Sequence, residues 1–404
     1  MKKIVIIEPA WPDNIHFPFN SGLLRTVADA YPSAEIIFIG SALQNRKIAA
    51  SLPQAISHRC EFRDWKVYSD PDTLPANILA RSSRLYKTAA HPIATSDLVI
   101  LTSVTGTTLT SIAAMLRPRH QQLQIYLHGN LNDLHGWRSR NPLRRFGDLY
   151  SALKRAARTN CKFIVLEEHI RSRAASTFPW MAGKLHFFPH PLRTEETLTI
   201  TKKLSFPIKI GLAGISSPDK GFAQFRELAT RLKTKFPGVF QFHAIGKRHP
   251  SNQDADFKDL DTAPREGQLE RADFLKQIDD MHFLFFWPTG DYYKNASSGV
   301  FYDALNRKIP LLSKSDLRAF HPAIQSMGII CDTLDELELA ITQVSDNEYQ
   351  SYNDGLSSFS ENFRHGALVN RFRYLVENFA EASPETINLT QINSMESHSK
   401  IGSV

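Results

Sequence analysis

Short apolar segments rich in β-branched residues alternate with segments of helical periodicity along most of this 404-residue chain. Alternation of this kind is typical of βαβ units, in which a parallel sheet is covered by helices on both faces. The predicted fold class is therefore α/β, with doubly wound parallel sheets. We predict strands at residues 3–8, 35–40, 97–102, 124–128, 162–166, 184–188, 208–213, 240–245, 283–287, 310–313 and 328–331, and helices at 21–31, 107–116, 221–233, 271–279, 299–306, 333–345 and 352–380.

The alternation is interrupted once, by the polar, threonine-rich segment 192–206. A chain of this length exceeds one ordinary core, and polar segments commonly separate domains. We therefore expect two Rossmann-like domains, at 1–195 and 205–360. We also expect a C-terminal helix at 361–382 that packs back on the N-terminal domain. The tail at 383–404, rich in Ser, Thr, Asn and Gln, is expected to be disordered.

Composition restricts the compartment and the partners. Three widely spaced cysteines, Cys60, Cys161 and Cys331, provide neither a disulfide framework nor a zinc motif, which favours a reducing cytoplasm. The first apolar run is too short for a signal peptide, and no segment approaches the roughly 20 apolar residues that span a bilayer. The net charge of +7 predicts an anionic partner.

Two loops that follow predicted strands of the second half have residues suited to phosphate. Ligands of doubly wound sheets bind at the carboxyl ends of the strands. Gly214 allows close backbone approach, and Lys220 supplies a cation at the start of a helix. A capped turn with a solvated lysine is the alternative for that loop. Gly246 ends the next strand, and by itself such a glycine more often marks a plain turn.

The third loop, which runs from Trp287 to a predicted helix, is the most informative. Ser297, Ser298 and Gly299 are small and leave the first amides of that helix unblocked, so the amides and the helix dipole favour a diphosphate there. Asp303 lies one helical turn further and suits a pair of ribose or sugar hydroxyls. A plain surface aspartate is the alternative.

These loops resemble the C-terminal half of GT-B glycosyltransferases, especially the large retaining family of bacterial sugar transferases. That family has two glutamates eight positions apart, the second followed by Ala and later by Gly-x-Pro. Here Asp303-Ala matches the second glutamate, Asn295 stands in place of the first, and Lys308 in place of the glycine before Pro310. Ile215 stands where the family has an arginine. The resemblance implies two Rossmann-like domains that face a cleft, and donor-binding roles for Gly214, Lys220, Gly246, Asn295, Ser297, Ser298, Gly299 and Asp303.

The N-terminal half offers matching parts. Gly22, after the first predicted strand, is similar to the family's glycine-containing loop that faces the donor phosphates. His128 resembles the family's histidine near the reacting sugar and is the predicted catalytic residue. A neutral imidazole orients a hydroxyl, or accepts its proton if the enzyme inverts. A histidine that caps a strand end is the alternative, and His16, Glu168 and His190 are weaker candidates.

A basic segment between Trp137 and Arg158 has apolar residues at helical spacing. Such an amphipathic helix suits an anionic bilayer surface, as in GT-B enzymes that act on polyprenyl-linked acceptors. An ordinary helix with its apolar stripe in the core is an equally expected alternative. Nucleic acid is not expected as a partner, because no recognised binding motif accompanies the charge. The basic residues are Arg138, Arg140, Arg144, Arg145, Lys154, Arg155 and Arg158.

The resemblance predicts a cytoplasmic glycosyltransferase, located at the inner face of the cell membrane if the basic helix binds lipid. It would move a sugar from a nucleoside-diphosphate sugar to a hydroxyl of a glycan or lipid-linked acceptor, in synthesis of bacterial surface polysaccharide or lipopolysaccharide. We expect no metal or other cofactor, because cations and amides would stabilise the leaving diphosphate. A sugar-nucleotide epimerase of the same fold and a non-catalytic nucleotide-sugar-binding regulator are the alternatives. The residues do not distinguish retaining from inverting transfer.

Overall fold

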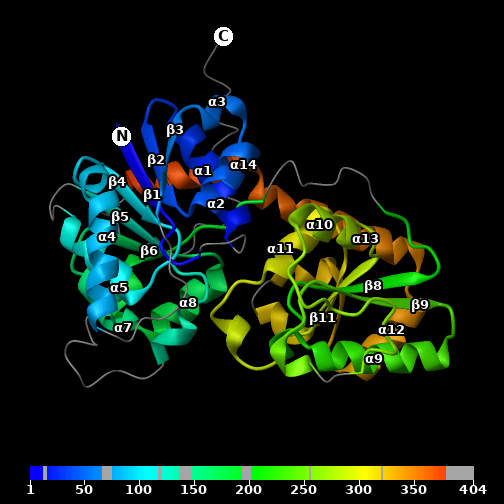
Figure 1. Ribbon diagram of the computed structural model, residues 1–404. Helices are drawn as coiled ribbons and strands as arrows, with labels where there is room; N and C mark the ends of the chain where they lie inside the picture. The colour runs from blue at the N-terminus through cyan, green and yellow to red at the C-terminus, as the bar shows by residue number, and fades with distance from the viewer. Residues whose placement is uncertain are drawn as a thin grey trace, which may run out of the picture. The chain divides into compact units, whose positions relative to one another are not determined.

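The computed structural model describes residues 1–11, 16–65, 75–116, 121–135, 147–192, 202–253, 256–319 and 322–378. These residues form two compact units, each a parallel sheet flanked by helices (Figure 1). Of the described residues, the first unit contains those up to 166, those from 171 to 191, and those from 365 to 378. The second contains residues 167–170 and 192–364. The predicted tail at 383–404, and most of the predicted linker, lie outside the described residues.

The sheet of the first unit has seven parallel strands in the order β3-β2-β1-β4-β5-β6-β7. The strand order reverses between β1 and β4, which pair with each other, so the carboxyl ends of these two strands flank the topological switch point. Ligands of doubly wound sheets bind at such a point. The strands are β1 (Lys3–Ile7), β2 (Glu35–Gly40), β3 (Cys60–Asp64), β4 (Leu98–Leu101), β5 (Gln122–Tyr126), β6 (Cys161–Val165) and β7 (Leu185–Phe187).

Burial explains which strands of the first unit the sequence revealed. Residues 4–7 of β1 are all buried, because helices cover both faces of the sheet, and the strand therefore reads as a continuous apolar run. β3 lies at the sheet edge and alternates charged and apolar residues, with Glu61 and Asp64 exposed. Charged residues are common on edge strands. Because they interrupt the apolar run, the sequence pattern did not predict β3.

The helices of the first unit form two layers, with α1, α2 and α14 over one face of the sheet and α4, α5 and α7 over the other (Figure 1). The α14 residues Leu368 and Phe372 are buried in the same core as α1 and β1. The helices and turns are α1 (Phe17–Ala30), α2 (Ala42–Ser51), α3 (Gln54–Ser57), α4 (Pro75–Ala94), α5 (Gly106–Met115), η1 (Asn132–His135), α7 (Leu149–Ala156), α8 (Glu168–Thr177), η2 (Pro179–Lys184) and α14 (His365–Glu377).

The single long helix predicted for residues 352–380 is wrong, because the structure has two helices there. A 3-10 turn at 361–363 and an extended Arg364 separate α13 from α14. The side chain of Lys162 in β6 holds α14 in the first unit, because its Nζ donates to the carbonyl oxygens of Leu375 (3.1 Å) and Asn378 (2.8 Å). These carbonyls lie in the last turn, where helices lack internal donors.

The sheet of the second unit has five parallel strands in the order β12-β11-β10-β8-β9, which reverses between β8 and β10. Helices α9 and α12 pack on one face and α10 and α11 on the other. Thr333 and Glu336 form a capping box at the start of α12, where the Thr333 side chain accepts from the Glu336 N–H. The elements are β8 (Ile208–Ala213), η4 (Pro218–Lys220), α9 (Phe222–Lys235), β9 (Phe240–Ile245), η5 (Pro250–Asn252), α10 (Arg271–Asp279), β10 (Phe283–Phe286), η6 (Tyr292–Lys294), α11 (Gly299–Arg307), β11 (Leu311–Lys314), η7 (Ser315–Ala319), η8 (Pro322–Ser326), β12 (Gly328–Cys331), α12 (Leu334–Gln343), α13 (Asp346–Ser360) and η9 (Glu361–Phe363).

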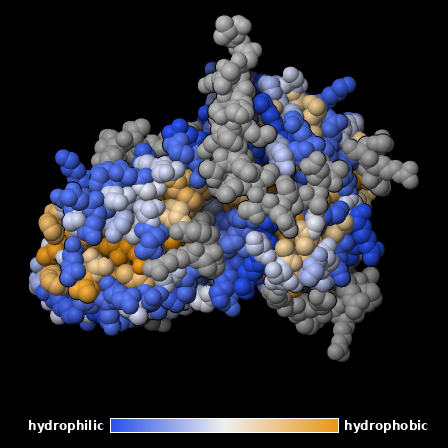
Figure 2. Space-filling model, turned by 180° about the vertical axis from the view of Figure 1, so that it is seen from behind, coloured by the Kyte–Doolittle hydropathy of each residue, from blue (hydrophilic) through white to orange (hydrophobic). Residues whose placement is uncertain are grey.

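The visible surface is mostly hydrophilic, and apolar residues gather over one area of the second unit (Figure 2). Large exposed apolar side chains in that unit include Phe206 and Leu339. None of the helices in the described part of the chain is long and apolar enough to cross a bilayer.

Candidate functional site

In the second unit, the loops after β8, β9 and β10 meet closely at the switch point. Gly246 has φ +132°, and a Cβ there would collide with the carbonyl oxygen of Gly214. Gly221 has φ +78°, and a Cβ there would collide with the carbonyl oxygen of Trp287. The main-chain N–H of Trp287 also donates to the Lys220 carbonyl at 3.2 Å. Only glycine permits these approaches, so the three loops form one tightly packed surface.

The Lys220 side chain is turned into this surface. Its Nζ donates to the carbonyl oxygen of Ala213 at 3.1 Å and lies against Gly214, where a Cβ would displace it. Burial lowers the pKa of Lys220 to about 8, although the charge of Asp303 acts in the opposite direction. Lys220 is therefore a held cation at the end of β8, and the alternative of a fully solvated lysine is excluded.

The start of α11, after β10, is open. Ser298 is the N-cap residue, but its side chain makes no capping hydrogen bond. Its Oγ is buried, and it has no hydrogen-bond partner among the described residues. Gly299 is exposed, and a Cβ there would meet no described atom within 4 Å. The first N–H groups of a helix have no internal acceptor, so this end presents donors and a positive dipole to open space.

A buried carboxylate, Glu167, lies beside the start of α11. Its Oε1 accepts from Ser297 Oγ (2.5 Å) and Tyr302 OH (3.2 Å). The Nδ1 atom of His169 lies 3.3 Å from its Oε2. Glu167, His169 and Ser298 line a small pocket with aromatic side chains of β10 and α11. The residue predicted from the sequence is the adjacent Glu168, whereas the carboxylate that contacts this site is Glu167.

The remaining predicted donor-binding residues lie on the same segment. Asn295 is buried in the loop that precedes α11. Asp303 accepts a hydrogen bond from Arg271 Nη2 at 2.6 Å, and its side chain is only 15% exposed. It is therefore not a plain surface aspartate, and hydroxyls bound there would share its carboxylate with Arg271.

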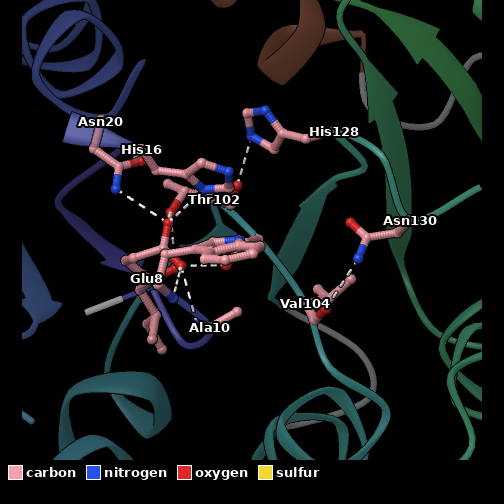
Figure 3. A network of polar contacts seen from close by, with 11 residues as sticks. Glu8, Ala10, His16, Asn20, Thr102, Val104, His128 and Asn130 are labelled. Carbon is pink, nitrogen blue, oxygen red and sulfur yellow. Dashed lines mark hydrogen bonds and ion pairs between the residues drawn. The ribbon is translucent and has the colours of Figure 1, made fainter. Parts of the chain in front are cut away.

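In the first unit, the polar centre is Glu8, the residue directly after β1 (Figure 3). Its side chain is fully buried, and both oxygens accept several hydrogen bonds. Burial alone would raise the pKa of Glu8, but the charge of His16 and hydrogen bonds from His16, Ser103 and Asn20 outweigh it and lower the pKa to about 2. The donors to Oε1 are the N–H groups of Ala10 (3.0 Å) and Trp11 (3.2 Å) and the hydroxyl of Ser103, and the donors to Oε2 are His16 Nδ1 (3.0 Å), Asn20 Nδ2 (3.1 Å) and Thr102 Oγ1 (2.9 Å).

Histidines that follow three different strands gather next to Glu8. His128 follows β5, and the centroid of its ring lies 4.3 Å from that of His16. His190 follows β7. The ring of Phe19 contacts both His128 and His190, with its centroid 4.5 Å from that of His128 and 5.3 Å from that of His190. His128 Nε2 lies 2.8 Å from the Thr102 carbonyl oxygen (Figure 3). Burial and the neighbouring His16 and His190 lower the pKa of His128 well below its usual value. His128 is therefore a neutral imidazole.

The loop interpretation of Gly22 is wrong, because α1 begins at Phe17 and Gly22 lies inside it. Pro18, in the first turn, favours this early start. Gly22 is buried, and a Cβ there would collide with the Pro191 side chain, which follows His190. Its role in the structure is close packing of α1, and its N–H is inside the helix rather than facing a ligand.

The described part of the basic segment is packed against the unit. Leu153 and Ala156 of α7 are buried, and α7 lies against α5. Arg155 donates to Thr110 Oγ1 at 2.7 Å, and Lys154 Nζ lies over the rings of Tyr150 and Trp180. This arrangement favours the alternative of an ordinary helix with its apolar stripe in the core. Arg138, Arg140, Arg144 and Arg145 lie outside the described residues, so the membrane contact stays a prediction.

Glu8 is the main residue of the candidate site that was not predicted from the sequence. The sequence contained one usable signal, since a glutamate directly after the first buried strand of a doubly wound domain lies at a switch point by topology. Within the described residues, no group of three or more His, Cys, Asp and Glu side chains is arranged to hold a metal ion.

Comparison with known proteins gave matches to solved structures only, since neither family models nor curated proteins match the sequence. An α,α-trehalose 6-phosphate synthase from Burkholderia multivorans matches with TM-score 0.61 and 11% identity, over 99% of this chain and 98% of that chain. An α-glucosyltransferase in complex with UDP-glucose and DNA matches with TM-score 0.59 and 12% identity, over 93% and 98%. A Listeria monocytogenes chain assigned as a UDP-N-acetylglucosamine 2-epimerase matches with TM-score 0.56 and 12% identity, over 94% and 96%. These similarities confirm the predicted GT-B fold.

Proposed function

We propose that this protein is a glycosyltransferase that moves a sugar from a nucleoside-diphosphate sugar to an acceptor hydroxyl. The observation that supports this most is the open start of α11, where a buried, unpartnered Ser298 hydroxyl stands beside exposed Gly299. An unsatisfied buried hydroxyl is costly in a folded protein, and a bound phosphate oxygen would satisfy it. The same surface holds the Lys220 cation.

The proposed donor site follows from general anion chemistry. The first amides of α11 and the Ser298 hydroxyl would donate to the diphosphate, and charge-assisted bonds of this kind contribute on the order of 1.5–3 kcal/mol each. Lys220 would add a positive charge as the nucleoside diphosphate leaves. A GT-B neighbour was solved with UDP-glucose, which makes a uridine diphosphate sugar the first donor to test.

The proposed acceptor is a hydroxyl of a glycan or lipid-linked sugar in bacterial surface polysaccharide synthesis. This finer assignment rests on the family resemblance of the Asn295–Pro310 segment. The fold leaves the acceptor class open, because the neighbour solved with UDP-glucose was solved with DNA as well. The acceptor site would use the histidine-rich switch point of the first unit, where neutral His128 can bind a hydroxyl.

The test is calorimetric titration with UDP-glucose, UDP-N-acetylglucosamine and GDP-mannose, in the wild-type protein and two serine variants. Ser298→Ala removes no hydrogen bond made by the described residues of the free protein, so we expect equal or higher stability and a binding affinity lower by about tenfold or more. Ser345→Ala is the matched control, because Ser345 caps α13 by accepting from the Glu348 N–H. That variant should lose about 1 kcal/mol of stability and keep its affinity.

Three results would contradict the proposal. The first is a protein that binds none of the three sugar nucleotides, and the second is a Ser298→Ala variant that binds as tightly as the wild type. The third comes from NMR of the bound sugar nucleotide incubated without acceptor. Conversion to its C2 epimer would identify the epimerase alternative, and tight binding without slow hydrolysis would identify a regulator.

A further inference from the structure

His16 and His128 are held by different groups, and the difference assigns them different chemistry. An ionised carboxylate only accepts hydrogen bonds, so the His16 Nδ1 that contacts Glu8 at 3.0 Å must carry a proton. In the neutral ring, Nε2 is then the atom with a lone pair. The side chain of His16 is 11% exposed, whereas that of Glu8 is fully buried. The carboxylate therefore orients the ring from behind.

His128 has no carboxylate partner of this kind. Its Nε2 donates to the Thr102 carbonyl oxygen at 2.8 Å, which leaves Nδ1 as its acceptor. A carbonyl stabilises an imidazolium less than a carboxylate does. Burial, His16 and His190 lower the pKa of His128, and the charge of Glu8 and the hydrogen bond to Thr102 oppose them only in part. His128 is suited to accept a hydrogen bond and poorly suited to keep a proton.

Glu8 is equipped to keep a negative charge opposite His16. The donors to Glu8 within the described ranges all belong to the first unit: two main-chain N–H groups, two hydroxyls, the Asn20 amide and the His16 ring. Among the residues that the structure describes, the charged and titratable groups that face His16 are Glu8 after β1, His128 after β5 and, through His128, His190 after β7. Among these only Glu8 is negative, so it compensates the charge that His16 acquires on accepting a proton.

We infer that His16 is the proton acceptor of the transfer reaction, that Glu8 is its positioning residue, and that transfer inverts the anomeric centre; this inference rests on the proposed function. The acceptor oxygen bonds to the anomeric carbon, its proton moves to His16 Nε2, and the carbon–oxygen bond to the diphosphate breaks with its electron pair on the leaving group. The imidazolium later releases the proton to water. In direct displacement the acceptor hydroxyl attacks the anomeric carbon from the face opposite the leaving diphosphate. The diphosphate oxygens cannot reach the hydroxyl proton from there, so the protein must supply the base.

The test uses hydrolysis of whichever of the three sugar nucleotides binds, with water as the acceptor. His16→Ala should lower the hydrolysis rate at saturating donor by about 10²- to 10⁴-fold and leave the donor dissociation constant unchanged. Added imidazole should restore part of the rate. His128→Ala should lower the rate by about tenfold or less, as for one neutral hydrogen bond. His58→Ala is the control, because His58 is exposed and lies in the same unit.

Two further readouts separate a catalytic role from a structural one. The acid-side decline of the rate with pH should disappear in His16→Ala, and proton NMR should show first the anomer opposite to that of the donor. Because Glu8 also holds the fold together, its role is measured in the wild-type protein, where nitrogen NMR should find the Nδ1-protonated tautomer of His16.

The outcomes distinguish this inference from the proposed function. If the protein binds a sugar nucleotide but His16→Ala hydrolyses it at the wild-type rate, the inference fails and the proposed function stands. A product with the donor's anomeric configuration, or an Nε2-protonated His16, would also overturn it. If no sugar nucleotide binds, the proposed function itself fails.

Discussion

The switch points of the two units are built in opposite ways. In the first unit, Glu8 is sealed after β1 and accepts six hydrogen bonds, so its charge is satisfied before any ligand arrives. In the second unit, α11 begins with an unpartnered Ser298 hydroxyl and an exposed Gly299, so its donors remain unused. The closed network around Glu8 fixes the position of the His16 ring, whereas the open start of α11 has donors available for an anion. We therefore expect mutations at the first site to lower stability and mutations at the second to lower ligand affinity.

The largest expected effect is on the stability of the first unit. Glu8→Gln keeps the shape but replaces an acceptor oxygen with a donor NH2 group that faces existing donors. We expect a loss of about 3–5 kcal/mol, as for other broken buried charge networks. Asp303→Asn is the second-unit counterpart and should cost about 1 kcal/mol or less, because the Asp303–Arg271 pair is partly exposed.

Hydrogen exchange measured by mass spectrometry reports on each unit separately. Peptides from β1 and β4 should lose protection in Glu8→Gln, while peptides from β8 and β10 keep it. Equal losses in both units, or equal effects of the two substitutions, would remove the contrast between the closed and the open site.

A smaller effect on the free energy of unfolding is expected when the pH is lowered. Since the pKa of Glu8 is lowered from 4.5 to about 2 in the fold, the unfolded chain takes up the proton first as the pH falls. The stabilisation by Glu8 is therefore complete above pH 4.5 and is lost as the pH falls towards 2, by about 3 kcal/mol. Urea unfolding at pH 5.5 and pH 3 should show that the difference in the free energy of unfolding between the wild type and Glu8→Gln is smaller at pH 3. An advantage that is the same at both pH values would argue against a native-state charge on Glu8.

The smallest expected effect concerns Lys220. Its pKa of about 8 means that its charge is present at pH 7 and mostly lost at pH 9. The affinity for UDP should therefore fall by up to about tenfold between these values, since the diphosphate is already ionised at pH 7. Lys220→Met should bind more weakly at pH 7 and show little change at pH 9. A variant with the same pH dependence as the wild type would mean that another group titrates.

The sequence predicted the second unit better than the first for a physical reason. The chemistry of α11 is local, because Ser298, Gly299 and Asp303 are adjacent along one helix and their spacing fixes their geometry. The strand ends at Gly214 and Gly246 follow from the same local pattern. Glu8, by contrast, draws its partners from the ends of β1 and β4 and from α1, about a hundred residues apart in the chain.

The sequence alone determined that the chain forms two doubly wound α/β units and which of its loops carry small residues and a lysine, since periodicity and loop composition are properties of neighbouring residues. Only the tertiary structure decided that Gly22 packs against Pro191, that Lys162 binds the end of α14, and that Glu8 binds His16. Each of these depends on which strands become neighbours in the sheet and which helices cover them. Those neighbours are selected by burial of the whole core, and no local pattern records them.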